Sequence, residues 1–174
     1  MTRLEDLQSL IRDIPDFPSP GIVFKDITPL LADQRAFATA IDHVAEHFVG
    51  ANVTHVVGIE ARGFIVAAPV AYRLGAGFVP LRKKGKLPWD VRGIDYTLEY
   101  GAERLEVHSD AVAAGDRVAV VDDVLATGGT ARAACDVIGG LGAEVAGVGV
   151  IIELAFLNGR DALGDLDVFS LLTY

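Results

Sequence analysis

Short apolar runs, each bounded by glycine or charged residues, recur along the chain and constrain its fold more than any other feature. They predict buried strands at residues 55–59, 78–81, 118–121, 146–152 and 168–172. Helical stretches are predicted between them, at residues 65–74 and 130–141. Because alternating strands and helices form parallel sheets with both faces covered, we expect an α/β fold with a mostly parallel sheet flanked by helices.

Other periodic segments add helices and a hairpin to this expectation. Apolar residues recur at helical spacing from residue 4 to 14, and more clearly from 37 to 48. Pro69 must either kink the helix at 65–74 or lie in its opening turn. Residues 94–100 and 103–107 alternate apolar and polar side chains around Gly101, which predicts a β-hairpin inserted beside the sheet.

Composition limits the class of protein. The chain has 174 residues, of which 51% are hydrophobic and 22% charged, and no repeat or linker divides it, so we expect one domain over residues 1–174. A formal net charge of −9 argues against a nucleic-acid partner, because a phosphate backbone is held mainly by lysine and arginine. The apolar runs are far shorter than the roughly 20 residues that span a bilayer, so no membrane association is expected.

The expected location follows from the cysteine content and the N-terminal residues. Cys135 is the one cysteine and cannot form an internal disulfide. The first residues, MTRLEDLQSL, carry charges where a secretory signal needs an apolar run. We therefore expect the protein in the cytoplasm.

The segment VAVVDDVLATGGT, residues 118–130, carries the clearest functional signal. Its strand ends in Asp122 and Asp123, and a glycine-rich loop then leads to the start of a helix. Ligands of open α/β sheets bind at such strand ends, and backbone N–H groups at a helix N-terminus suit a phosphate monoester. The two acids would repel that phosphate, so they should face ligand hydroxyls or a bound Mg²⁺.

Two other nucleotide-binding classes and a purely structural role are the alternatives for this segment. The nucleoside triphosphatase loop requires G-x-x-x-x-G-K-[ST], but the Gly85-Lys86 pair is followed by Leu87. No G-x-G-x-x-G occurs, which disfavours a dinucleotide site. A turn that is capped by the two acids and permitted by the glycines is the structural alternative.

The complete run, an apolar strand followed by Asp-Asp-x-x-Ala-Thr-Gly-Gly-Thr, resembles the phosphoribosyl pyrophosphate loop of the type I phosphoribosyltransferases. The resemblance implies that family's fold, with an inserted hairpin and a mobile loop. It also implies that Asp122 and Asp123 bind the ribose hydroxyls. The 5′-phosphate would be bound by Ala126, Thr127, Gly128, Gly129 and Thr130. Family members that act on 6-oxopurines typically carry an acid in place of Ala126, so this chain is similar to the adenine branch.

A second segment, residues 15–33, resembles the base-binding segment of that branch. The resemblance implies that Phe24 stacks on adenine and that main-chain groups near Val23 and Lys25 read the polar edge of the base. An aromatic face suits a planar purine, and backbone donors and acceptors distinguish an amine from a carbonyl. The alternative is that Phe24 belongs to the core.

Two further segments resemble the pyrophosphate-binding parts of the family. GIEARGF, residues 58–64, would supply Arg62 as a catalytic contact to the leaving group, whereas Glu60 receives no role. RKKGKLP, residues 82–88, would contact pyrophosphate, partly in the neighbouring subunit's site of a homodimer, through Arg82, Lys83 and Lys86. Such a segment suits a mobile loop that closes over pyrophosphate, although most charge runs are simply solvated.

TLEYG, residues 97–101, resembles the family motif near the reacting centre, with Glu99 as the catalytic candidate. Glu99 would either assist proton movement at the purine or stabilise positive charge on the sugar, and the sequence leaves both roles open. Glu99 as an ordinary hairpin residue is the alternative. The four histidines show no metal-ligand spacing with cysteine, so no protein metal site is expected and Mg²⁺ would be held mainly through the donor.

Taken together, the resemblance implies purine salvage, in which phosphoribosyl pyrophosphate and adenine give AMP and pyrophosphate with Mg²⁺ as cofactor, in a homodimer. One alternative is a regulatory phosphoribosyltransferase-like domain that binds the nucleotide without catalysis. Glu99 and the RKKGKLP segment speak against it, as does the absence of an added basic domain. Another alternative is the same chemistry on a different base.

Overall fold

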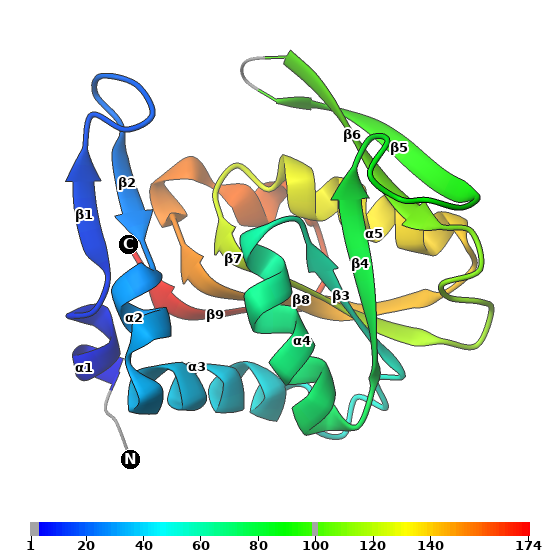
Figure 1. Ribbon diagram of the computed structural model, residues 1–174, viewed down its shortest axis with the longest axis horizontal. Helices are drawn as coiled ribbons and strands as arrows, with labels where there is room; N and C mark the ends of the chain where they lie inside the picture. The colour runs from blue at the N-terminus through cyan, green and yellow to red at the C-terminus, as the bar shows by residue number, and fades with distance from the viewer. Residues whose placement is uncertain (1–3, 99–100) are drawn as a thin grey trace.

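A seven-stranded sheet forms the centre of the computed structural model, which describes residues 4–98 and 101–174 (Figure 1). The strand order is β5-β6-β4-β3-β7-β8-β9. Five neighbouring strands are parallel: β4 (Gly77–Lys83), β3 (His55–Ile59), β7 (Arg117–Leu125), β8 (Glu144–Glu153) and β9 (Val168–Thr173). They contain the five apolar runs, so the predicted, mostly parallel sheet is confirmed.

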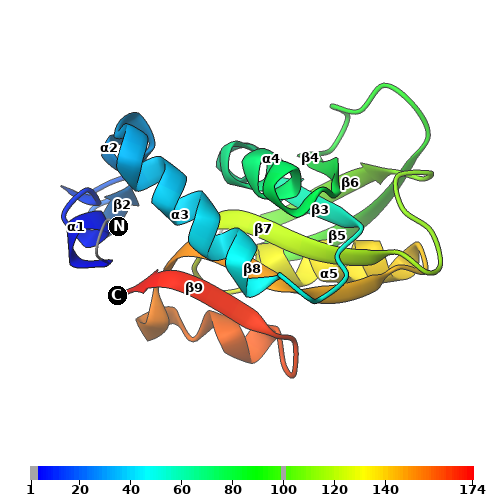
Figure 2. The same cartoon turned by 90° about the horizontal axis from the view of Figure 1, so that it is seen from below.

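Helices cover both faces of the sheet. Figures 1 and 2 show α3 (Gln34–His47) and α4 (Arg62–Leu74) on one face and α5 (Gly129–Gly140) on the other. Consecutive residues Val56 and Val57 are both fully buried, because alternate side chains of a strand face opposite sides and here each side meets helices. No helix in the described part of the chain is long and apolar enough to cross a membrane.

The predicted hairpin extends the sheet at one edge. β5 (Val91–Leu98) pairs with β6 (Gly101–His108), and β6 pairs antiparallel with the end of β4, where Arg82 lies opposite Glu106. The hairpin begins at Val91, earlier than the alternating pattern indicated. Because β6 pairs with Arg82 and Lys83, the hairpin lies next to the basic segment, residues 82–88.

The N-terminal prediction is partly wrong. Only α1 (Leu4–Gln8) is helical, and the expected continuation to residue 14 is instead β1 (Arg12–Pro15), which pairs antiparallel with β2 (Val23–Asp26). Pro15 and Pro18 cannot continue a helix. The backbone hydrogen-bonding groups are satisfied instead in a two-stranded sheet, in which Ile14 lies opposite Phe24. The short helix α2 (Thr28–Ala32) then leads to α3.

Two local features complete the fold. Pro69 lies inside α4, beyond its opening turn. The connection from β8 to β9 forms two short 3₁₀ helices, η1 (Ala155–Leu157) and η2 (Gly159–Ala162). The second of these packs against the glycine-rich loop described below.

Phe48, directly after α3, packs against the bare backbone of β8, and its side chain is 2% exposed. A Cβ atom on Gly149 would lie 3.0 Å from the Phe48 ring, so the two fit only because the strand lacks a side chain there. We expect Phe48→Ala to lower the free energy of unfolding by about 3–5 kcal/mol, since it leaves a cavity in the core.

Urea unfolding followed by circular dichroism would measure this change. Val49→Ala is the matched control, because Val49 is 72% exposed and should change stability by no more than about 0.5 kcal/mol. Equal stabilities of the two variants would contradict the placement of Phe48 in the core.

Candidate active site

A cleft of about 430 Å³ opens at the carboxyl ends of β3 and β7. Several separate stretches of the chain line it: the β2 region, the β3–α4 loop, the hairpin with the end of β4, the β7–α5 loop, and Leu154 directly after β8. The predicted residues that it brings together are Val23, Phe24, Lys25, Arg62, Lys83, Asp122, Asp123, Ala126, Thr127, Gly128, Gly129 and Thr130. Arg82 and Lys86 do not line it, and Glu99 lies outside the described residues.

Asp122 and Asp123 line this cleft from the last part of β7, which continues to Leu125, beyond the predicted strand end at residue 121. Asp123 is 4% exposed, and its N–H donates to Asp122 Oδ1 over 2.9 Å. Burial, together with the neighbouring Asp123 charge, raises the pKa of Asp122 well above its usual value. The Nε atom of Arg62 lies 2.9 Å from Asp123 Oδ2 and compensates part of this charge.

Asp123 Oδ2 is nevertheless short of a hydrogen-bond donor. The atom is buried, and no donor among residues 4–98 and 101–174 meets it in hydrogen-bonding geometry, although the Arg62 charge is close. Leaving a buried acceptor unmatched is unfavourable, so such atoms are generally satisfied or functional. An acceptor of this kind suits the hydroxyl of a bound sugar.

Gly63 allows helix α4 to begin directly against these acids. A Cβ atom at this position would lie 2.7 Å from Asp122 Oδ1 and 3.1 Å from the Val121 carbonyl oxygen. The close approach places Arg62, the first residue of α4, between Asp123 and the Phe24 ring, whose centroid is 5.0 Å from the guanidinium carbon. Arg62 therefore contacts both the acidic pair and the candidate base-binding residue.

The glycine-rich loop between β7 and α5 has the shape of an anion site. Gly128 adopts a left-handed conformation with φ 84° and no side chain caps the helix that follows. A side chain on Gly128 would collide with the Gly159 carbonyl, and one on Gly159 would collide with the Ala126 carbonyl. The first backbone N–H groups of α5 have no partner within the helix and lie at the positive end of its dipole. They therefore suit the predicted phosphate.

The β2 segment closes the opposite side of the cleft. The Phe24 ring meets the edge of Phe17 at 5.2 Å between centroids. Lys25 Nζ contacts Asp13 Oδ1 at 2.6 Å and lies 4.1 Å from the centroid of the Tyr174 ring. Its ammonium group is thus already engaged, and the role of its main chain in base binding stays a prediction.

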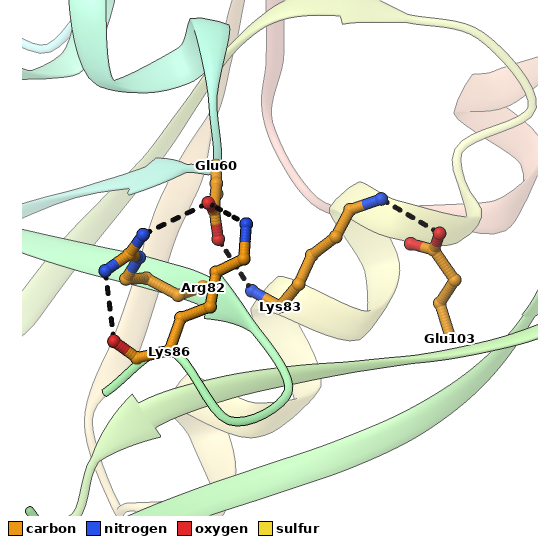
Figure 3. Close-up of polar contacts among 5 residues, drawn as sticks. All are labelled: Glu60, Arg82, Lys83, Lys86 and Glu103. Carbon is orange, nitrogen blue, oxygen red and sulfur yellow. Dashed lines mark hydrogen bonds and ion pairs between the residues drawn. The ribbon is translucent and has the colours of Figure 1, made fainter. Parts of the chain in front are cut away.

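The basic segment is organised by Glu60, a residue to which the sequence pattern gave no role (Figure 3). The Glu60 carboxylate contacts Lys86 Nζ at 2.7 Å and Arg82 Nη2 at 3.2 Å, and accepts the Lys83 N–H at 3.0 Å. Burial would raise the Glu60 pKa, but the hydrogen bonds from Lys86, Arg82 and Lys83 outweigh it and lower this pKa to about 2. Arg82 and Lys86 therefore pair with Glu60 rather than line the cleft.

Sequence reasoning also missed Tyr96 and Glu103, which line the cleft from the hairpin. They lie directly opposite each other in the β5–β6 register. The alternating pattern of the two strands is consistent with this pairing, but predicting which residues lie opposite each other requires the position of the turn.

Glu60→Gln removes the charge that holds Arg82 and Lys86, and we expect it to lower the free energy of unfolding at pH 7 by about 1–3 kcal/mol. Since the folded pKa of Glu60 is below its ordinary value of 4.5, the stabilisation is complete above pH 4.5 and disappears as the pH falls towards 2. The difference between wild type and variant should shrink over that range.

Urea unfolding at a series of pH values would measure this difference. Asp42→Asn is the control, because Asp42 pairs with Arg73 on the exposed surface and such a pair contributes at most about 1 kcal/mol. A wild-type-to-variant difference that stays constant from pH 5 to pH 2 would contradict the role of Glu60.

Comparison with known proteins identifies the class to which this fold and site belong. A phosphoribosyl transferase domain matches residues 30–169, which include strands β3 to β8, the acidic pair and the glycine-rich loop. The chain therefore belongs to the phosphoribosyltransferase family.

Within that family, the chain is similar to adenine phosphoribosyltransferases along its length. The one from Methylococcus capsulatus is 58% identical over 98% of this chain and 100% of its own. The crystal structure of the one from Thermoanaerobacter pseudethanolicus gives a TM-score of 0.96 at 48% identity, covering 99% of this chain and 100% of the other. The Saccharomyces cerevisiae enzyme, solved with adenine and an imino-altritol bisphosphate, gives 0.91 at 39% identity, covering 97% and 98%.

Proposed function

We propose that this protein transfers the 5-phosphoribosyl group from phosphoribosyl pyrophosphate to adenine, giving AMP and pyrophosphate in purine salvage. The observation that carries the proposal is the acid pair of half-buried Asp122 and buried Asp123, with the unmatched Asp123 Oδ2, beside a helix N-terminus suited to phosphate. Sugar hydroxyls and a 5′-phosphate together satisfy both features. The similarity to adenine phosphoribosyltransferases supports adenine as the base.

Each part of the cleft has a distinct task in this reaction. Asp122 and Asp123 accept hydrogen bonds from the ribose hydroxyls, and residues 126–130 hold the 5′-phosphate. Phe24 stacks on adenine, with main-chain groups near Val23 and Lys25 at its polar edge. This arrangement holds the base and the anomeric carbon in one orientation, which removes much of the entropic barrier to their reaction.

The displacement breaks the bond between the anomeric carbon and the pyrophosphate oxygen, and forms a bond from that carbon to an imidazole nitrogen of adenine. The bond electrons leave with pyrophosphate, so Arg62 and Lys83 stabilise the negative charge that develops there. The adenine nitrogen gives up its proton in the same reaction. Glu99 is proposed either to assist this proton transfer or to stabilise positive charge on the sugar.

Mg²⁺ is proposed as the cofactor, held mainly through the donor. Within residues 4–98 and 101–174, no group of three or more histidine, cysteine, aspartate or glutamate side chains could hold a metal ion. Mg²⁺ commonly binds through one or two carboxylates and substrate phosphates, and Asp122 and Asp123 fit that requirement. When bound, the ion would neutralise charge on the departing pyrophosphate.

The wider assignments stay predictions. They comprise a single domain with a base-binding segment at about residues 15–33, a homodimer in which Arg82, Lys83 and Lys86 partly serve the neighbouring site, and a cytoplasmic location. They also include closure of the RKKGKLP segment as a mobile loop, and the lack of nucleic-acid and membrane partners.

An assay of nucleotide formation with phosphoribosyl pyrophosphate, Mg²⁺ and a panel of purine and pyrimidine bases tests the proposed function. We expect AMP from adenine and little product from 6-oxopurines or pyrimidines. A different preferred base would show the same chemistry on another substrate. Binding of donor and nucleotide without turnover would favour the regulatory alternative.

Replacing Asp122 and Asp123 together by Asn should almost abolish activity. The double variant keeps the size of both side chains but removes the charge from the ribose site, so kcat/KM for phosphoribosyl pyrophosphate should fall far more than stability. Steady-state kinetics and urea unfolding would measure the two effects separately. Asp42→Asn, on the exposed surface, is the control, and a wild-type kcat/KM in the double variant would refute the sugar-binding role.

Phe24→Ala should raise the KM for adenine by about two- to tenfold through the loss of stacking, which is worth about 0.5–1.5 kcal/mol beyond buried area. Phe156→Ala provides a control, since Phe156 is 68% exposed and does not line the cleft. Initial-rate kinetics with each substrate varied in turn would separate the effects. If only donor kinetics changed, Phe24 would not contact the base.

A further inference from the structure

Glu103 is an acid in the candidate active site that no sequence motif singled out. It lies on β6, and its Oε1 atom is 2.9 Å from Nζ of Lys83 at the end of β4 (Figure 3). Its other oxygen accepts a hydrogen bond of 3.0 Å from the Tyr96 hydroxyl. All three side chains line the cleft, so a negative charge lies next to the cation predicted to bind pyrophosphate.

The Lys83–Glu103 pair differs from the pairs made by Glu60. The Glu60 side chain is only 8% exposed and holds two cations that do not line the cleft. The side chains of Lys83 and Glu103 are 51% and 34% exposed, and ion pairs with that access to water contribute little net free energy. Among Arg82, Lys83 and Lys86, Lys83 is therefore the cation that can change partners at a small cost in free energy and that lines the cleft.

Glu103 also keeps its charge. The hydrogen bond from Lys83, with a further one from Tyr96, lowers the pKa of Glu103 despite partial burial. The Tyr96 hydroxyl in turn interacts with the Thr130 side chain of the glycine-rich loop. These contacts hold an ionised carboxylate beside the position where pyrophosphate would meet Lys83.

We propose that Glu103 is a positioning residue that occupies the Lys83 ammonium before ligand binds and is exchanged for a pyrophosphate oxygen when it does. The inference rests on the proposed function and adds a role to it. Before binding, Glu103 keeps Lys83 directed into the cleft. After binding, its carboxylate repels the neighbouring phosphate charge, which weakens pyrophosphate binding and favours release of the product.

Titration calorimetry with pyrophosphate and Mg²⁺ tests this exchange without relying on turnover. Glu103→Gln keeps the size of the side chain and removes its charge, so pyrophosphate should bind about two- to fivefold more tightly, the range of one partly exposed charge interaction. In kinetics, the KM for phosphoribosyl pyrophosphate and the inhibition constant of pyrophosphate should fall together. The KM for adenine should not change.

Two further variants show whether the effect acts through Lys83. Asp95→Asn removes a charge from the same hairpin, where Asp95 pairs with Arg104 at 3.1 Å outside the cleft, and should leave the affinity unchanged. Lys83→Met should weaken pyrophosphate binding. In the Lys83→Met background, adding Glu103→Gln should have a smaller effect than in wild type, because the shared partner is gone.

The exchange is refuted if Glu103→Gln binds pyrophosphate as wild type does or more weakly. It is also refuted if Asp95→Asn tightens binding equally, or if Glu103→Gln has its full effect without Lys83, because either result shows only a general effect of charge. If wild type binds neither pyrophosphate nor phosphoribosyl pyrophosphate, the proposed function itself fails. If wild type binds pyrophosphate and Glu103→Gln does not bind it more tightly, only the role of Glu103 is refuted.

Discussion

Two adjacent carboxylates near the end of a buried strand impose the constraint on which the rest of the site depends. Asp123 is buried and Asp122 half-buried in the cleft, and burial of neighbouring like charges is unfavourable unless cations and donors are close. Gly63 lets α4 start against β7, and Arg62 thereby comes within 2.9 Å of Asp123. The acid pair is therefore tolerated because α4 begins beside β7 and brings the Arg62 charge close to it.

The same principle of matched charge extends across the basic segment. Arg82 and Lys86 pair with Glu60, and Lys83 pairs with Glu103. In the proposed reaction, a pyrophosphate group that binds these cations would replace carboxylates that already pair with them. The net free energy of such binding would be a difference between two sets of contacts, and this difference would allow a chain of net charge −9 both to bind and to release a highly charged anion.

The strands of the sheet and the helices that flank it could be predicted because their apolar residues are the buried ones, as Val56 and Val57 illustrate. The acid pair and the glycine-rich loop could also be predicted from the sequence, since their residues are contiguous and follow a predictable apolar strand. The β1–β2 pairing could not be predicted, because a short edge strand such as Arg12–Pro15 depends more on its partner, Val23–Asp26, than on its own pattern. The roles of Glu60 and Glu103 depend on which distant cation each one meets, and local sequence does not contain that information.

A crystal structure of the protein with AMP bound would test the account most directly. We expect the ribose hydroxyls within hydrogen-bonding distance of Asp122 and Asp123, with one donating to Asp123 Oδ2. The 5′-phosphate should lie on the N–H groups of residues 126–130, and the adenine ring should stack on Phe24. A ribose that is remote from both acids, or a phosphate bound elsewhere than at the start of α5, would contradict the account.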